Sequence, residues 1–137
     1  MKLAICTDVF ADLSYTDMLD KVKSLGIDAV EMTAGGWGAR KHCNTAELLA
    51  DEGKRKEFMG ELEKRGMRIS ALNTSCNPLW PSKTGEEYKK SMYDCATLAG
   101  LLGVKKIVAM AGRQRDRHHP ELDHLYRFLA GFHGSGV

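Results

Sequence analysis

The chain has 137 residues, of which 43% are hydrophobic and 28% are charged, and its formal net charge is +2. This composition is typical of one soluble globular domain, and so small a net charge argues against a nucleic-acid partner or an acidic membrane surface. Because no apolar run is long enough for a membrane-spanning helix and the first apolar stretch is too short for a signal peptide, we expect a cytoplasmic protein without membrane contact.

The first predicted elements are a strand at residues 2–7 and a helix that begins after Ser14. Ser14 and Asp17 have the spacing of a capping box, and Met18, Leu19 and Val22 follow on one helical face. Gly at the end of a helix commonly adopts positive φ. The helix is therefore expected to end near residue 26, before a short apolar strand at residues 27–32.

The next predicted segment contains two helices and a strand. Asn44 with Glu47 predicts the start of a short helix, and Gly53 is expected to interrupt it before a longer helix that carries Phe58 and Leu62. Gly66 then predicts a helix end, followed by an apolar strand at residues 67–72. We expect the apolar residues of the longer helix to face the core.

A third helix and a fourth strand follow. Thr84 with Glu87 predicts the start of a helix that buries Tyr88, Met92 and Cys95 among others, and a last apolar strand is expected at residues 104–110. After residue 112 the sequence becomes rich in His and Arg and loses its periodicity. We therefore divide the chain into a domain at residues 1–112 and an atypical tail at residues 113–137 with one short helix.

The three helix–strand junctions repeat one pattern. Gly26, Gly66 and Gly103 stand roughly 40 positions apart, which is the size of one βα unit. Strands that alternate with helices pair in parallel through right-handed crossovers. The pattern predicts an α/β fold with about four βα units, either as a flavodoxin-like open sheet or as part of a (β/α)₈ TIM barrel.

The four cysteines are widely scattered and form no C-x-x-C pair. A zinc site or a disulfide framework needs closer or patterned spacing. In a cytoplasmic chain we expect buried free thiols at all four positions, which are Cys6, Cys43, Cys76 and Cys95.

An ordered series of short motifs lies near the predicted strand ends. They are Ala34-Gly35-Gly36-Trp37, His42-Cys43-Asn44, Leu48-Leu49-Ala50-Asp51, and Ser70-Ala71-Leu72-Asn73 with Asn77-Pro78-Leu79. In this order the chain resembles the amino-terminal half of the sugar-phosphate isomerase/epimerase family, the xylose-isomerase-like TIM barrels related to endonuclease IV. The resemblance extends over residues 1–112 and implies a partial (β/α)₈ barrel.

The resemblance also implies an isomerase or epimerase that acts on a sugar or sugar phosphate with a divalent metal, Mn, Mg or Zn. Family metal ligands lie mainly at the ends of strands five to eight, which have no counterpart here. Where relatives often carry His near the Asn-Pro-Leu motif, this chain has Ser75, Cys76 and Trp80. We therefore assign no catalytic residue and no metal ligand, and expect a truncated chain that is inactive alone and does not bind the metal.

Active-site groups of a barrel lie where strands end and βα loops begin. On that basis the candidate substrate-binding residues are a carboxylate, an indole, an imidazole and two amides: Glu31, Trp37, His42, Asn73 and Asn77. Glycines 35, 36 and 38 match no phosphate-binding spacing, and we attribute them to loop flexibility. A partial barrel also exposes its inward face, which a homodimer that completes the barrel would cover. Docking of residues 122–129 against the sheet and poor solubility are the two alternatives.

Two functions of other classes remain open at this point. One is a non-catalytic sugar-binding or assembly module that uses the loop ends alone. The other is an independent flavodoxin-like domain that binds a phosphate group. The four histidines near the carboxyl end (His118, His119, His124 and His133) lack helical ligand spacing and are interpreted as surface residues.

Overall fold

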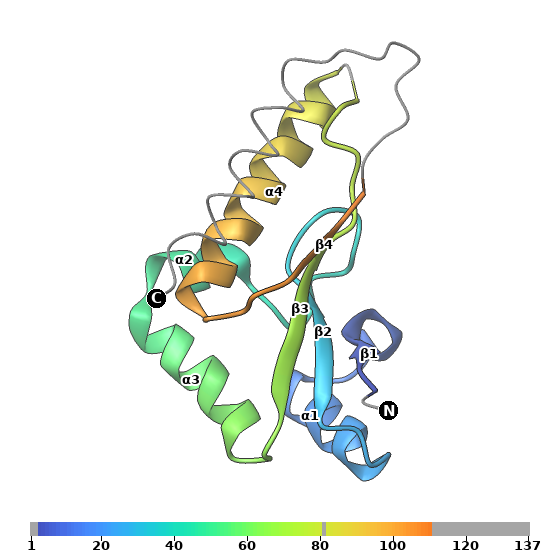
Figure 1. Ribbon diagram of the computed structural model, residues 1–137, viewed down its shortest axis with the longest axis vertical. Helices are drawn as coiled ribbons and strands as arrows, with labels where there is room; N and C mark the ends of the chain where they lie inside the picture. The colour runs from blue at the N-terminus through green and yellow to red at the C-terminus, as the bar shows by residue number, and fades with distance from the viewer. Residues whose placement is uncertain (1–2, 81, 111–137) are drawn as a thin grey trace.

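Four parallel strands form one sheet in the protein, whose computed structural model describes residues 3–80 and 82–110. The strands are β1 (Ile5–Cys6), β2 (Ala29–Thr33), β3 (Arg68–Thr74) and β4 (Ile107–Ala109). They lie side by side in chain order (Figure 1). A flavodoxin-like sheet places its first strand between the second and third, whereas a (β/α)₈ barrel adds each strand beside the preceding one. The strand order therefore supports the predicted partial barrel and argues against the flavodoxin-like alternative.

Helices pack on this sheet and bury a shared core. They are α1 (Tyr15–Ser24), α2 (Thr45–Ala50), α3 (Glu52–Glu63) and α4 (Lys83–Leu101), with a short 3₁₀ helix η1 (Thr7–Phe10) directly after β1. Figure 1 shows α2, α3 and α4 along one side of the sheet. The core cluster draws on helices and strands alike and includes Leu19, Val30, Leu62, Leu72 and Leu98. Burial of these apolar side chains is the main favourable contribution to stability.

The first strand is shorter than predicted. We expected residues 2–7, but the described strand covers only Ile5–Cys6, because the chain turns into η1 at Thr7. The Thr7 hydroxyl is buried and accepts a hydrogen bond from the Thr33 backbone N–H at 3.3 Å. The Thr7 side chain thus accepts from a backbone N–H of β2 with which a longer β1 would have paired.

The helix starts confirm two of the three predicted caps. Ser14 Oγ accepts from the Asp17 N–H at 3.2 Å, and Asn44 Oδ1 accepts from the Glu47 N–H at 3.4 Å. The third prediction, Thr84 with Glu87, is wrong. The cap of α4 is Ser82, whose hydroxyl accepts from the Gly85 N–H at 3.4 Å. Ser is a preferred residue at this position.

The break between α2 and α3 is at Asp51 rather than at Gly53. Asp51 has an extended backbone, and its carboxylate accepts from the Lys54 N–H at 3.0 Å. Gly53 lies inside α3. The predicted interruption is therefore real, but a capping aspartate causes it, because Asp competes with helical backbone bonds and favours caps. The junction glycines Gly26 and Gly66 have φ of 76° and 60°, as expected for helix ends.

The sheet face opposite the helices is the one that a closed barrel turns inward. Ile107 of β4 packs against the core, so the next residue, Val108, points to the other face, where it is 37% exposed. Leu3, before β1, and Met110, directly after β4, are 56% and 46% exposed. Apolar exposure was predicted for this face. Val108 is exposed there, whereas the alternation of the strand turns Ile107 toward the helices.

The cysteines are free thiols, as predicted. Cys43, Cys76 and Cys95 are buried, and Cys6 is half-buried. Burial raises the pKa of Cys43 to about 11 and that of Cys95 to about 12. Because the thiolate is the reactive form, these side chains behave as small apolar core residues at neutral pH.

Within residues 3–80 and 82–110, no helix is long and apolar enough to cross a membrane. The predicted tail at residues 113–137, its short helix, its histidines and the domain boundary after residue 112 all lie outside the described residues.

Candidate functional site

Glu31 and Asn73 meet on the open face of the sheet. Val30 and Met32 belong to the core, so Glu31 between them points to the opposite face. The register between β2 and β3 shifts between Val30 and Glu31, and such irregularities re-aim a side chain. Asn73 Nδ2 donates to Glu31 Oε1 at 2.5 Å. Two candidates 42 positions apart in sequence are thus direct partners near the carboxyl ends of neighbouring strands.

Ser75 fixes the orientation of the Asn73 amide. The Ser75 backbone N–H donates to Asn73 Oδ1 at 2.8 Å, and the Ser75 hydroxyl donates to the same oxygen at 2.7 Å. Because a backbone N–H only donates, the atom that it contacts is the amide oxygen, and the NH₂ group is left to face Glu31. In the described part of the chain, Glu31 Oε2 accepts no hydrogen bond. This oxygen is available to a hydroxyl group of a ligand.

Trp37 lies in the loop after β2 and is 57% exposed. Its indole Nε1–H donates to the Tyr88 hydroxyl of α4 at 2.7 Å, and its backbone N–H donates to the Ser75 carbonyl at 3.0 Å. The two rings are edge-to-face, with centroids 6.1 Å apart and an interplanar angle of 79°. The structure thus connects Trp37 to the residue that orients Asn73.

Asn77 has a local role in the loop after β3. Its Oδ1 accepts from the Leu79 backbone N–H at 3.1 Å, which is an Asx-turn. The side chain is half-buried. Its predicted contact with substrate stays a prediction, because this hydrogen bond explains the residue without a ligand.

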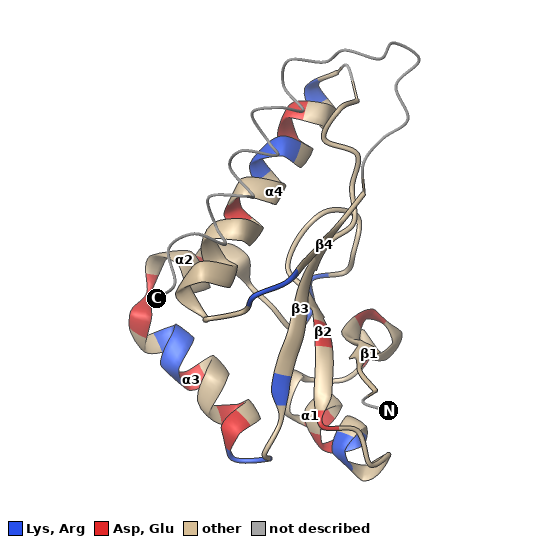
Figure 2. Ribbon diagram, viewed as in Figure 1, with Lys and Arg blue, Asp and Glu red and all other residues tan. Residues whose placement is uncertain are grey.

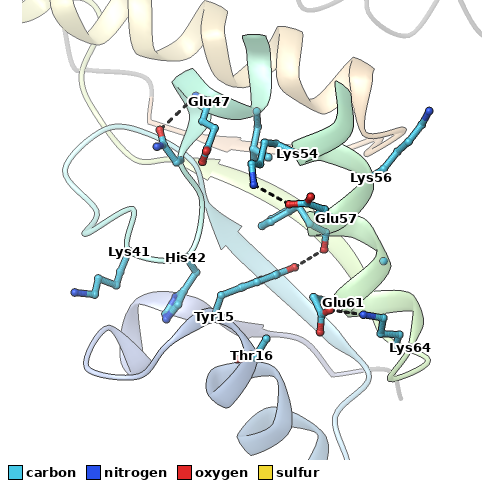
Figure 3. A pocket seen from close by; sticks show the side chains of 14 residues that line it. Tyr15, Thr16, Lys41, His42, Glu47, Lys54, Lys56, Glu57, Glu61 and Lys64 are labelled. Atoms are coloured by element: carbon cyan, nitrogen blue, oxygen red, sulfur yellow. Dashed lines mark hydrogen bonds and ion pairs between the residues drawn. The ribbon is translucent and has the colours of Figure 1, made fainter. Parts of the chain in front are cut away.

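His42 lies apart from the other candidates. It is 7% exposed, and its Nε2 lies 3.1 Å from the Leu13 carbonyl oxygen. A carbonyl only accepts, so Nε2 carries the proton in this hydrogen bond. The ring lines a groove of about 810 Å³ between α1 and the helices α2 and α3, on the helix side of the sheet (Figure 3). The structure therefore does not bring His42 together with Glu31 and Asn73.

Several side chains that line this groove already have partners within the protein. Tyr15 stacks on Phe58 with centroids 4.7 Å apart, and its hydroxyl donates to the Phe58 carbonyl at 2.9 Å. Burial raises the pKa of Tyr15. Figure 3 shows Lys54 paired with Glu57, at 2.9 Å, and Lys64 paired with Glu61. We interpret the groove as a seam between helices, since Lys54 and Lys64 pair with neighbouring glutamates and the Tyr15 hydroxyl bonds across it.

The glycines of the loop after β2 have a packing reason. A Cβ at Gly35 would overlap Ser91 Oγ, and one at Gly38 would overlap the Thr33 methyl group. Gly36 has φ of 72°, and a Cβ there would meet the Ser75 carbonyl. Close approach and positive φ explain these residues, so our attribution to loop flexibility was wrong.

Two residues of α4 were missed by the sequence reasoning. Ser91 Oγ accepts from the Gly36 N–H at 2.9 Å, and Tyr88 holds the indole of Trp37. Tyr88 was predicted as a core residue, but it is only half-buried. No local signal could have found either contact, because the partners lie 55 and 51 positions away.

The described residues do not assemble a metal site. In residues 3–80 and 82–110, no three His, Cys, Asp or Glu side chains come together in a group that could hold a metal ion. Glu31 faces an amide rather than a second carboxylate or an imidazole. A divalent metal needs several oxygen or nitrogen ligands, so this part of the chain alone does not fit one.

Known proteins are similar to this chain in sequence and in fold. The profile of the family "Xylose isomerase-like TIM barrel" matches residues 19–133. The "uncharacterized protein YfiH" of Bacillus subtilis (strain 168) is 48% identical over 112 residues, which are 82% of this chain and 36% of that protein. The chain thus spans about a third of the length of this curated relative.

Two solved structures are similar in fold. The probable 3-DHS dehydratase AsbF of Bacillus anthracis, involved in petrobactin synthesis, matches with a TM-score of 0.67 and 17% identity, over 97% of this chain and 50% of that one. A xylose isomerase domain-containing protein of Salmonella typhimurium LT2 matches with a TM-score of 0.61 and 18% identity, over 94% and 45%. The chain therefore belongs to the xylose isomerase-like TIM barrel family.

Proposed function

We propose that this chain contributes the amino-terminal half of a sugar or sugar-phosphate isomerase or epimerase, with Glu31 in contact with the substrate. The observation that carries the proposal is the hydrogen bond between Glu31 and Asn73 on the open face of the sheet. Active sites of (β/α)₈ enzymes lie at the carboxyl ends of the strands. Membership of the xylose isomerase-like family supports a sugar-related substrate.

The geometry gives each residue of this group a separate task. Ser75 orients the amide of Asn73, and Asn73 holds one carboxylate oxygen of Glu31. The other oxygen is then directed without rearrangement toward a sugar hydroxyl. Glu31 binds and orients the substrate, and Asn73 acts by positioning Glu31.

A divalent metal, Mn, Mg or Zn as the resemblance implies, would polarise a substrate carbonyl. Because residues 3–80 and 82–110 assemble no ligand group, that metal needs ligands from another part of a barrel. We therefore propose that the 137-residue chain alone neither holds the metal tightly nor turns over a sugar. We assign no reaction step to the metal here.

The test combines a turnover assay with a binding assay. The chain is incubated with Mn²⁺, Mg²⁺ or Zn²⁺ and a panel of ketoses and ketose phosphates, and epimerisation is followed by ¹H NMR in D₂O. We expect no turnover, and we expect Glu31→Gln to weaken sugar binding by about tenfold, as for loss of one hydrogen bond to a charged group. Glu63→Gln, at an exposed position of α3, is the matched control. Turnover by the chain alone would contradict its inactivity, and equal sugar binding by both variants would contradict the role of Glu31.

A non-catalytic sugar-binding or assembly module is the second candidate. The absence of a metal-ligand group among the described residues favours it. A chimaera that joins this chain to the remaining carboxyl-terminal part of the YfiH protein distinguishes the two functions. Gain of sugar epimerisation supports an enzyme half, whereas sugar binding without turnover in the chimaera supports the module.

The open face of the sheet supports self-association into a completed barrel. β1 and β4 are the edge strands, and Val108 on this face is exposed. Unpaired edges and exposed apolar side chains favour association. Sedimentation equilibrium should show a dimer that Val108→Lys dissociates and that Leu25→Lys, at an exposed helix end, leaves intact. A wild-type monomer would contradict the dimer.

We extend the proposal to location and partners. Figure 2 shows acidic and basic residues interspersed along α3 and α4, and the net charge of the chain is only +2. Neither feature favours a polyanion. Buried, protonated thiols suit a reducing compartment. We propose a cytoplasmic protein whose partners are sugars and a second barrel half rather than nucleic acid or membrane.

A further inference from the structure

An exposed tryptophan in the loop after β2 is held in one orientation. More than half of the Trp37 surface is open to solvent, with a relative exposure of 57%. An indole in water has no need of a protein partner for its N–H, yet Nε1 donates to the Tyr88 hydroxyl at 2.7 Å. Tyr88 comes from α4, a 19-residue helix packed on the core. Helix α4, through Tyr88, thus fixes the Trp37 side chain, whose exposed ring few packing contacts would restrain.

The direction of this hydrogen bond leaves the faces of the indole open. An indole N–H lies in the ring plane, so its acceptor lies at the edge of the ring. The interplanar angle of 79° and the centroid distance of 6.1 Å agree with an edge contact to Tyr88. Tyr88 therefore covers neither flat face of Trp37. The high exposure of Trp37 means that a flat aromatic surface stays accessible.

The backbone around Trp37 is connected to the polar pair. The Trp37 N–H donates to the Ser75 carbonyl, and the Gly36 N–H before it donates to Ser91 Oγ of α4. The same Ser75 donates twice to Asn73 Oδ1, and Asn73 donates to Glu31. The backbone N–H of Trp37 and the Glu31 carboxylate are therefore the two ends of one hydrogen-bonded chain. Glu31 lies in β2, and Trp37 lies in the loop that follows the carboxyl end of the same strand.

We propose that Trp37 is a preformed stacking surface for the C–H face of a cyclic sugar whose hydroxyl group binds Glu31, and that Tyr88 is its positioning residue. A pyranose ring has an apolar face of C–H groups and a rim of hydroxyls, and the indole and the carboxylate match these two features. Because the ring is already oriented, little side-chain entropy is lost on binding. The inference rests on the proposed function, since it places the sugar beside Glu31.

The first test measures the Trp37–Tyr88 contact without a ligand. The chain has two tryptophans, so Trp80→Phe leaves Trp37 as the single reporter. In that background, Tyr88→Phe keeps the ring and removes the acceptor. We expect lower fluorescence anisotropy and about a twofold rise in acrylamide quenching, because one hydrogen bond no longer restrains the indole. A Trp37→Phe background, which reports Trp80 alone, should show no change, and an unchanged Trp37 signal would overturn the positioning role.

The second test uses methyl β-D-xylopyranoside, a locked ring, with glycerol as a polyol that has no ring face. We expect the xyloside, but not glycerol, to quench Trp37 fluorescence in a saturable way. The Kd for the xyloside should be about tenfold higher in Trp37→Ala and about threefold higher in Tyr88→Phe. Because Trp37→Ala removes the reporter, its Kd is measured by ligand-observed NMR. Binding that needs Glu31 but not Trp37 overturns the stacking surface and leaves the proposed function standing. Binding that needs Trp37 but not Glu31 supports the surface and contradicts the proposed function, and no saturable binding contradicts both.

Discussion

Replacing Asn73 with aspartate would place two carboxyl groups within hydrogen-bond distance. In the protein, Asn73 Nδ2 lies 2.5 Å from Glu31 Oε1, and both side chains are half-buried. Asn73→Asp keeps the size of the side chain and the oxygen that Ser75 contacts, but it removes the donor to Glu31. The substitution therefore isolates the interaction that the proposed site depends on.

The expected loss of stability in Asn73→Asp follows from repulsion between two carboxylates at a partly buried site. Two unit charges about 4 Å apart repel by about 4 kcal/mol at an effective dielectric constant of 20. Proton uptake by one carboxyl group limits the loss, because like charges raise the pKa of one member of the pair. We expect the free energy of unfolding of Asn73→Asp to fall by about 2 kcal/mol at neutral pH.

The loss of unfolding free energy in Asn73→Asp should be larger at neutral pH than at acidic pH. A carboxyl group whose pKa is raised in the folded state binds a proton there before the unfolded chain does, so the penalty is complete above the raised pKa. It shrinks as the pH falls toward the ordinary carboxyl pKa of about 4. Urea unfolding followed by circular dichroism at pH 7.5 and pH 4.5 should show a smaller difference between variant and parent at the lower pH.

Asn77→Asp is the matched control. Asn77 Oδ1 accepts from the Leu79 N–H, and a carboxylate accepts there equally well. We expect a change within about 0.5 kcal/mol at both pH values. Equal losses for the two variants, with the same pH dependence, would refute the reasoning about Glu31 and Asn73.

Two further substitutions and one labelling experiment test the fold around the site. In a urea titration, Gly35→Ala should lower the free energy of unfolding by about 1–3 kcal/mol, because the added methyl group would overlap the Ser91 hydroxyl of α4. Gly60→Ala is the control: the space around this position of α3 is open, so the substitution should be neutral or stabilising. Ser82→Ala should destabilise by about 1 kcal/mol in thermal unfolding since it removes the cap of α4, and a comparable loss in Thr84→Ala would argue against that cap. The thiol of Cys43, whose pKa burial raises to about 11, should react with Ellman's reagent at pH 8 only after urea unfolding, and fast labelling of the native protein would contradict its burial.

Local signals in the sequence predicted most of the elements. Glycines at the helix ends adopt positive φ, and the caps at Ser14 and Asn44 form as expected, because these preferences depend on a few neighbouring residues. The apolar periodicity of α1 placed Met18 and Leu19 in the core. The family resemblance was confirmed by the match over residues 19–133.

The wrong predictions concern choices between nearby residues of similar propensity. Ser82 and Thr84 are both good caps, and Asp51 and Gly53 both interrupt helices, so short-range patterns do not separate them. Packing of α4 decides the first case, since Gly85 lies so close to the Trp80 carbonyl that a Cβ would overlap it.

The sequence by itself determined the α/β class, the alternation of strands and helices and the polar character of the strand ends, because these depend on periodicity and on residue type. Only the tertiary structure decided which polar residues act together. Glu31 meets Asn73 across 42 positions and Trp37 meets Tyr88 across 51, while His42 turns to the helix side. Such contacts arise from strand register and helix packing, which bring distant residues together and which no local pattern of residues specifies.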